Sequence, residues 1–288
     1  MSPTTLLYVP ADQPAMLTKA RQRNADAVII DLEDAVPVDA KDSARQAARD
    51  FVIAPPAGAS AIYVRVNGDQ NLGLDVEAVA HPNLAGIVIA KAQYMGQVEA
   101  ADRILFSVEE AHGIPHGTFG VTCLIETAIG LREAFELASH PRVNRLGLGE
   151  ADLGADLGID HAAADSVWDP IRLRIVVDSA AAAIDAPAAP VSTNFTDMDE
   201  LTRSTTHLSS LGFGSRAAIH PAQIPVIEEA FRPTDDEVEA AKNLLHAHEL
   251  SISRGDGVFT DAKGRMVDEA VVRHARRTMA RSSEEGSA

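Results

Sequence analysis

Polar residues follow the apolar runs of this 288-residue chain at the points where buried strands would end. The densest group is the segment DLEDAV, in which Asp31, Glu33 and Asp34 come directly after Val28–Ile30. Three carboxylates within four residues repel one another unless a cation or basic groups neutralise them. Later apolar runs lead to further polar side chains: Arg65 and Asn67, Lys91, Glu126, Glu150 and Asp152, and His220. Carboxylates grouped with a few cations are typical of a divalent-metal site that binds an anionic substrate.

Glu126 and Asp152 are the predicted ligands of a Mg²⁺ ion. This ion prefers oxygen ligands and is typically bound through one or two protein carboxylates. Glu126 ends an otherwise apolar run, where a carboxylate must be paired or functional. Asp152 could instead cap a helix that begins just before Leu153. Glu150 is a competing ligand, so the residue types alone leave both alternatives open.

Arg65 and Lys91 are the cations predicted to bind the substrate. Arg65 could hold a carboxylate by a bidentate contact or stabilise a developing enolate oxygen. Its alternative role is a structural salt bridge to the acidic segment, and the two roles can coexist. We assign structural roles to His220, expected to be a hydrogen-bonded group at a strand end, and to Cys123, expected in the core.

The predicted elements alternate between short apolar runs and longer amphipathic stretches. Eight runs have strand character: Thr5–Val9, Ala27–Leu32, Ala61–Val66, Gly86–Lys91, Val121–Glu126, Asn144–Gly149, Pro190–Phe195 and Arg216–His220. Helical stretches lie between them: Pro14–Asn24, Lys41–Phe51, Asp75–Ala80, Tyr94–His112, Gly130–Ser139, Asp169–Ile184 and Asp197–Leu211. Strands alternating with helices imply parallel pairing, since each crossover needs a dozen or more residues.

This alternation predicts an α/β protein with a (β/α)₈ TIM barrel, whose active site lies at the carboxyl ends of the strands. The alternative is an open doubly wound sheet, which usually carries a Gly-rich loop after its first strand. Here the first strand leads to Pro10, Ala11 and Asp12, with no such loop.

We divide the chain into a barrel domain (residues 1–232), a small helical lid segment (233–280) and a disordered tail (281–288). In the lid segment, Thr234 and Glu237 predict the start of a helix that ends near Glu249. A short hairpin over Gly257–Met266 and a last helix over Glu269–Met279 follow.

The charge balance excludes some classes of partner. The chain has 42 acidic and 25 basic residues and a net charge of −17, which argues against binding to nucleic acid or anionic membranes. No segment approaches the roughly 18 apolar residues that a membrane span needs. The N-terminal segment MSPTTLLYVP lacks the features of a signal peptide. With Cys123 as the sole cysteine, we expect a cytoplasmic location.

Several motifs together resemble the citrate lyase beta-subunit-like proteins of the HpcH/HpaI aldolase/citrate lyase superfamily. This group includes malyl-CoA and citramalyl-CoA lyases. The resemblance runs nearly end to end and is carried by LLYVPADQPAMLTKA, DLEDAV, YVRVN, LIETAIG, GLGEADL, GFGSRAAIHPAQI and GRMVDEAV. It implies a (β/α)₈ barrel that assembles as homotrimers or hexamers.

The resemblance also implies roles for individual residues. One Mg²⁺ would be held by Glu126 and Asp152, with Glu33 and Asp34 supporting it through water, and we group Asp31 with these supporting carboxylates. Arg65 would hold the substrate carboxylate or the thioester oxygen. Asp268 would be a catalytic acid or base on a lid from a neighbouring subunit, a role that its sequence surroundings alone do not suggest.

The chain departs from the family pattern at several positions near these motifs. The departures are Gln13, Ala90, Gln93, Tyr94, Ile129, Ser192, Asn194 and Ala270. The metal pair, Arg65 and Asp268 are retained, so the expected reaction is cleavage of a malyl-, citramalyl- or citryl-CoA type thioester to an acyl-CoA and a 2-oxo acid. One alternative is condensation with thioester hydrolysis, as in a malate synthase. The other is a non-catalytic subunit that binds an acyl carrier.

Overall fold

In the computed structural model of this protein, residues 3–20, 22–57, 60–160, 163–254, 259–260 and 266–282 are described. The chain forms two compact units, Met1–Phe231 and Arg232–Ala288. The division falls beside the predicted start of the lid segment at residue 233. The action of that segment as a lid stays a prediction.

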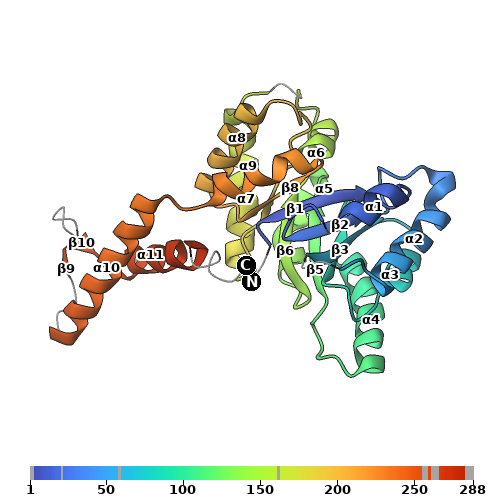
Figure 1. Cartoon of the computed structure of the whole chain (residues 1–288), viewed down its shortest axis with the longest axis horizontal. Coiled ribbons are helices and arrows are strands. Elements are labelled where there is room, and N and C mark those ends of the chain that lie inside the picture. The colour runs from blue at the N-terminus through green and yellow to red at the C-terminus, as the bar shows by residue number, and fades with distance from the viewer. Residues whose placement is uncertain are drawn as a thin grey trace. The chain divides into compact units, whose positions relative to one another are not determined.

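The first unit is a closed barrel of eight parallel strands in sequential order (Figure 1). The strands are β1 (Thr5–Pro10), β2 (Ala27–Asp31), β3 (Ala61–Val66), β4 (Gly86–Ile89), β5 (Gly120–Ile125), β6 (Val143–Leu148), β7 (Ala188–Ala189) and β8 (Ser215–Ala218). The pairing of β1 with β8 closes the sheet. The predicted (β/α)₈ barrel is therefore confirmed, and the open doubly wound sheet is excluded.

Two apolar layers explain why these strands form. Every residue of β2 and β4 is buried, as expected for parallel strands covered on both faces. The larger hydrophobic cluster packs strands against the surrounding helices and includes Ile30, Ile87 and Ile125. A smaller cluster lies on the opposite face of the strands, with Ile29 and Val88 among its buried members. Alternation along each strand thus separates an outer core from the barrel interior.

The helices of the first unit alternate with the strands, and side-chain caps start two of them. The helices are α1 (Pro14–Ala20), α2 (Lys41–Ile53), α3 (Leu72–Val79), α4 (Met95–His112), α5 (Ala128–Ala138), α6 (Glu150–Leu157), α7 (Asp165–Ala181), α8 (Met198–Leu211) and α9 (Ile224–Phe231). Thr127 accepts a hydrogen bond from the Gly130 N–H group at the start of α5, and Asp197 accepts one from Glu200 at the start of α8. Such caps satisfy backbone N–H groups that have no partner within the helix.

The seventh strand lies earlier in the chain than predicted. The prediction of a strand over Pro190–Phe195 is wrong, because β7 comprises only Ala188–Ala189. Pro190 has no N–H group to donate to a neighbouring strand. Further on, Asn194 Oδ1 accepts hydrogen bonds from the N–H groups of Thr196 (3.1 Å) and Asp197 (3.2 Å), which turns the chain into α8.

Helices α6 and α9 are not among the helical stretches predicted from the sequence, although a helix beginning near Leu153 was the alternative considered for Asp152. Within α6, Gly154 lowers helix propensity. A Cβ atom at Gly154 would lie 3.3 Å from ring atoms of Trp168, which is buried on α7. The indole therefore packs on the glycine, and this tertiary contact outweighs the weak local signal.

The second unit contains α10 (Asp235–Arg254) and α11 (Glu269–Ser282), which pack against each other. The predicted cap is present, since Glu237 Oε2 accepts from Thr234 N–H (2.9 Å) and Thr234 Oγ1 accepts from Glu237 N–H (3.3 Å). Strands β9 (Phe259–Thr260) and β10 (Met266–Val267) pair antiparallel.

The remaining calls on the second unit fall partly outside the described residues. These are residues 257–258 and 261–265 of the predicted hairpin and residues 283–288 of the predicted tail. Arg281 and Ser282, placed in the tail by the prediction, end α11. Over the described part of the chain, none of the helices combines the length and apolar character needed to span a bilayer.

Candidate active site

A cavity of about 690 Å³ opens among the residues at the carboxyl ends of the barrel strands. Its lining includes Asp31, Arg65, Glu126 and Asp152. This end of the strands is where a barrel of this type places its active site. The structure thus brings the predicted metal pair and the predicted substrate-binding arginine to one cavity.

Arg65 on β3 is held from two sides. Its Nε and Nη2 atoms donate to Asp31 Oδ1 (2.7 Å) and Oδ2 (2.6 Å), and its Nη1 atom lies 3.2 Å from Glu33 Oε2. The guanidinium carbon also lies 5.0 Å from the centre of the Tyr8 ring. The structural salt bridge considered for Arg65 is therefore present. Because the side chain still lines the cavity, its remaining N–H donors can face a ligand.

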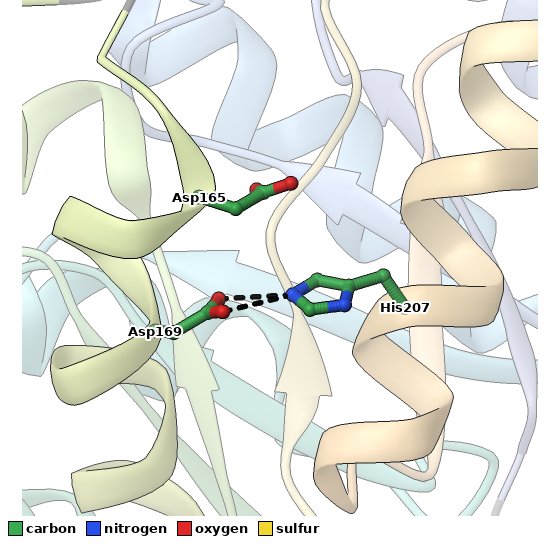
Figure 2. Close-up of side chains that lie close together, drawn as sticks. All are labelled: Asp165, Asp169 and His207. Carbon is green, nitrogen blue, oxygen red and sulfur yellow. Dashed lines mark hydrogen bonds and ion pairs between the residues drawn. The ribbon is translucent and has the colours of Figure 1, made fainter.

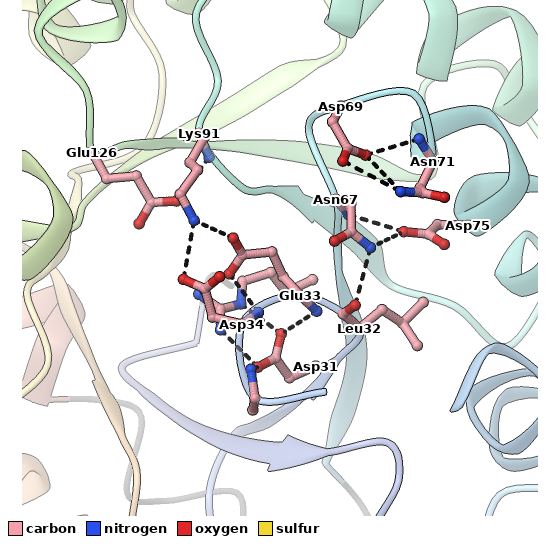
Figure 3. Close-up of polar contacts among 12 residues, drawn as sticks. Asp31, Leu32, Glu33, Asp34, Asn67, Asp69, Asn71, Asp75, Lys91 and Glu126 are labelled. Atoms are coloured by element: carbon pink, nitrogen blue, oxygen red, sulfur yellow. Dashed lines mark hydrogen bonds and ion pairs between the residues drawn. The ribbon is translucent and has the colours of Figure 1, made fainter. Parts of the chain in front are cut away.

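Lys91 adopts a backbone conformation that side-chain-bearing residues rarely use. Its φ angle is 48°, which costs of order 1 kcal/mol or more and persists where surrounding structure enforces it. This conformation directs the Lys91 N–H group to Glu126 Oε1 at 2.7 Å. The ammonium group pairs with Glu33 and with Asp34 Oδ2 (3.0 Å) (Figure 3). Partial burial lowers the pKa of Lys91, but these hydrogen bonds raise it above its usual value.

The acidic segment is rigidly hydrogen-bonded. Asp31 Oδ1 accepts from the Glu33 N–H group (2.9 Å), and Glu33 Oε2 accepts from the Asp34 N–H group (2.8 Å). Lys41 Nζ donates to the carbonyl oxygens of Leu32 and Glu33, both at 2.6 Å. Lys41 lies beyond the DLEDAV motif, and no role is predicted for it from residue type. In the structure it anchors the backbone of the turn that presents the carboxylates.

Glu126 is a carboxylate short of positive charge. Its side chain is 2% exposed, and burial raises its pKa to about 7. The Lys91 N–H group and Arg65 lower this pKa, whereas the negative charges of Glu33 and Asp152 raise it. Gly149 makes room for the group, since a Cβ atom there would lie 2.5 Å from Glu126 Oε2. A buried carboxylate in this state fits the binding of a further cation.

Asp152 suits the role of second metal ligand beside Glu126 better than Glu150 does. It is the third residue of α6, which Gly149 precedes as N-cap, so the alternative reading of Asp152 as a helix cap is wrong. Its half-buried carboxylate makes no hydrogen bond or ion pair with the described residues. Glu150, the competing ligand, is occupied, because its Oε1 and Oε2 atoms accept from Arg172 at 2.6 and 3.0 Å. Two oxygen donors in one cavity match the preference of Mg²⁺.

A second group of possible ligands is an ion-pair network. Asp165, Asp169 and His207 offer ligand atoms within 4.8 Å of one another (Figure 2). However, Arg172 Nη1 donates to Asp165 Oδ1 (2.6 Å) and Asp169 Oδ1 (3.0 Å), and His207 Nε2 lies 3.0 Å from Asp169 Oδ1. The arginine already supplies the positive charge, so this group links α7 to α8.

The residues given structural roles behave accordingly. His220 Nδ1 accepts from the Ala222 N–H group at 3.2 Å, and its ring stacks on Phe195 with centroids 5.4 Å apart. Cys123 is fully buried. These contacts leave neither side chain a part in the cavity described above.

Asp268 belongs to the second unit. It is exposed, and its Oδ1 atom accepts from the Val271 N–H group (3.0 Å) at the start of α11. This is an ordinary helix cap. The catalytic role implied by the family resemblance stays a prediction.

Comparison with known proteins places the chain in context. Residues 4–221 match the HpcH/HpaI aldolase/citrate lyase family. Among curated proteins, the chain is 30% identical to a citrate lyase subunit beta of Leuconostoc mesenteroides subsp. cremoris, covering 96% of this chain and 91% of that protein. It is 31% identical to a (3S)-malyl-CoA thioesterase of Cereibacter sphaeroides, covering 96% and 94%.

Solved structures give the same picture. CitE from Mycobacterium tuberculosis in complex with magnesium, acetoacetate and coenzyme A is 30% identical, with a TM-score of 0.77 and 98% of each chain covered. A citrate lyase beta subunit from M. tuberculosis complexed with oxaloacetate and magnesium is 30% identical, with a TM-score of 0.65, and the match covers 80% of this chain and 97% of that one.

Proposed function

The chain belongs to the HpcH/HpaI aldolase/citrate lyase family, and from that membership we propose that it is a Mg²⁺-dependent carbon–carbon lyase. Its substrate would be a coenzyme A thioester of the malyl, citramalyl or citryl type, cleaved to an acyl-CoA and a 2-oxo acid. The observation that carries this proposal is the buried carboxylate of Glu126 in one cavity with Asp152 and Arg65.

Glu126 and Asp152 would hold the ion. Relatives of known structure contain magnesium together with acetoacetate, pyruvate or oxaloacetate, which supports this assignment. When bound, Mg²⁺ supplies Lewis-acid polarisation of the substrate oxygens. Lys91 fixes Glu126 through its N–H group and, with Arg65, binds the anionic end of the substrate.

Arg65 is oriented for the developing charge. A base removes the hydroxyl proton, the oxygen forms the carbonyl of the 2-oxo acid, and the carbon–carbon bond breaks as its electron pair passes to the thioester carbonyl oxygen. The resulting enolate oxygen gains stabilisation from the N–H donors of Arg65, which Asp31 holds in a fixed orientation. Asp268 then donates a proton to the enolate carbon from a lid supplied by a neighbouring subunit. A lid from a neighbouring subunit requires an oligomer, and the family resemblance implies a homotrimer or hexamer, which light scattering on the purified protein tests.

The likeness to (3S)-malyl-CoA thioesterase favours thioester hydrolysis as a second candidate reaction. Both reactions use the same carboxylates and arginine, so the products separate them. Cleavage releases a 2-oxo acid and leaves the thioester intact, whereas hydrolysis releases free coenzyme A thiol.

The test is a panel assay with the purified protein. Malyl-CoA, citramalyl-CoA and citryl-CoA are each incubated with Mg²⁺, with and without EDTA, while 2-oxo acid and free thiol are followed separately. We expect Mg²⁺-dependent 2-oxo acid release from one of them. Release that persists in EDTA overturns the metal assignment, and no release from any substrate favours a non-catalytic, carrier-binding subunit.

Two variants separate the competing ligands. Asp152→Asn should abolish Mg²⁺-dependent turnover, because the neutral amide is a poor ligand for this ion. Glu150→Gln should keep Mg²⁺ binding, since Glu150 is already paired with Arg172. The opposite result would exchange the roles of these two carboxylates.

A further inference from the structure

The cavity extends well below the catalytic layer into the barrel interior. Along β6 its lining begins at Asn144 and Arg145, near the start of the strand, and continues to Gly149 after the strand has ended. Pro3, which precedes β1, also lines it. The interior of such a barrel is normally filled by layers of side chains. Here a continuous space follows the barrel axis beneath Glu126 and Arg65.

The layer beneath the catalytic side chains is apolar. Residues two positions apart in a strand point to the same face and are separated by about 6.6 Å. Three polar residues of the site, each at the end of a strand, therefore have a cavity-lining hydrophobic or aromatic residue directly below them. These pairs are Ile29 and Asp31, Tyr63 and Arg65, and Leu124 and Glu126.

Small side chains keep this layer open. Gly147 is paired in register with Leu124 and Ala188, and all three line the cavity. On β8, the strand next to β7, Ala217 is paired with Leu6 of β1. Larger residues at these positions would fill the space, as they do in a packed barrel core. We call this part of the cavity the lumen chamber and define it by Leu6, Ile29, Val88, Leu124, Ala188 and Ala217.

The lower end of the lumen chamber is polar. Arg145 is 6% exposed, and its Nη1 atom donates to Ser215 Oγ (3.1 Å) and to the Pro3 carbonyl oxygen (3.2 Å). Asp185 and Asn144 line the same end. Covering these polar groups with hydrocarbon would cost free energy, because they would lose contact with water. An apolar ligand would therefore end above them.

We propose that the lumen chamber binds an alkyl substituent on the hydroxyl-bearing carbon of the substrate. The 2-oxo acid released would then carry a chain longer than the methyl group of pyruvate. This inference rests on the proposed function, which places that carbon beside Glu126 and Arg65. The thioester arm is an unsuitable occupant, since its amide groups would lose hydrogen bonds to water against walls of this kind.

Chain length gives the first measurement. Burying one CH₂ group stabilises by roughly 0.8 kcal/mol, which corresponds to about a fourfold gain in affinity. Calorimetry with Mg²⁺ present should therefore show affinity rising about fourfold per carbon from pyruvate through 2-oxobutanoate, 2-oxopentanoate and 2-oxohexanoate. Equal affinities across this series overturn the proposal. Tighter binding of 2-oxoadipate than of 2-oxohexanoate also overturns it, because the lower end would then be an anion site.

Filling variants give the second measurement. Ala217→Leu and Ala188→Leu both add bulk to the lumen chamber and should lower affinity for 2-oxohexanoate at least tenfold while changing pyruvate binding less than twofold. Ala181→Leu makes the same chemical change at an exposed position of α7 and serves as the control. Circular dichroism and thermal melting identify variants that fold. If folded filling variants bind 2-oxohexanoate like the control, the proposal is wrong.

Binding also separates this inference from the proposed function. If affinity rises with chain length but no thioester is cleaved, the lyase proposal fails and the alkyl-binding chamber stands. If a thioester is cleaved but only those yielding glyoxylate or pyruvate react, the lyase proposal stands and the chamber inference fails.

Discussion

Substitution of Glu126 by glutamine tests the charge balance of the site directly. Glutamine has nearly the same shape and keeps an oxygen that accepts from the Lys91 N–H group, which lies 2.7 Å from Glu126 Oε1. It removes the ionisable group whose pKa burial raises from 4.5 to about 7. The variant therefore isolates the free energy of keeping a buried negative charge without a bound cation.

The sign and size of the expected change in the free energy of unfolding follow from the coupling between proton binding and folding. A carboxyl group with a raised pKa binds its proton more tightly in the folded state, so its favourable contribution is lost as pH rises from 4.5 to about 7. The difference between these two values corresponds to about 3 kcal/mol, at about 1.4 kcal/mol per tenfold change. Without metal, Glu126→Gln should raise the free energy of unfolding by up to about 3 kcal/mol at pH 8, and by under about 1 kcal/mol at pH 5.

The assay is urea denaturation at pH 5 and pH 8, in EDTA and in excess Mg²⁺. Mg²⁺ should stabilise the wild-type protein at pH 8 and leave Glu126→Gln nearly unchanged, because a ligand stabilises only the state that binds it. Glu136→Gln, at an exposed position on α5, is the matched control and should change little. A variant that is no more stable than wild type at pH 8 in EDTA would refute the charge argument. Equal stabilisation of both proteins by Mg²⁺ would remove Glu126 from the metal site.

Three further substitutions probe how the site is built. In Gly149→Ala, the added Cβ atom would lie 2.5 Å from Glu126 Oε2 and displace the carboxylate, so calorimetry should show Mg²⁺ binding weakened at least tenfold. Unchanged Mg²⁺ affinity would show that the glycine is dispensable. Arg65→Lys keeps the positive charge but loses the bidentate contact with Asp31, so kcat/KM should fall about 100-fold. An effect on KM alone, with kcat unchanged, would contradict a role for Arg65 in stabilising the enolate. Asp268→Asn keeps an oxygen that caps α11 through Val271, so the fold should persist while kcat falls by about 10² to 10⁴; unaltered kcat would show that Asp268 is only a cap.

The amino-acid sequence by itself determined the barrel and the chemical class of the site. Alternation of apolar runs with amphipathic stretches is a local signal, and it specified seven of the eight strands to within a few residues. Parallel strands have their carboxyl ends at the same end of the barrel. For that reason, charged residues after separate strands could be assigned to one site before any distance was known.

The sequence-based predictions of secondary structure were wrong where a tertiary contact or a side-chain hydrogen bond outweighed the intrinsic preference of the residues. Strand β7 ended before Pro190 because the following segment, which looked extended, is turned by the Asn194 side chain. Helix α6 formed around Gly154 because Trp168 packs on it. These outcomes depend on hydrogen bonds and packing that residue propensities do not contain.

Only the tertiary structure decided which carboxylate is available to a cation. Glu150 and Asp152 are equivalent in sequence, but Arg172, on a different helix, neutralises Glu150 and leaves Asp152 facing the cavity with Glu126. The unusual backbone of Lys91, which aims an N–H group at Glu126, likewise has no counterpart in residue type. Charge and hydrogen bonding act through space, so residues far apart in the chain fix the properties of the site.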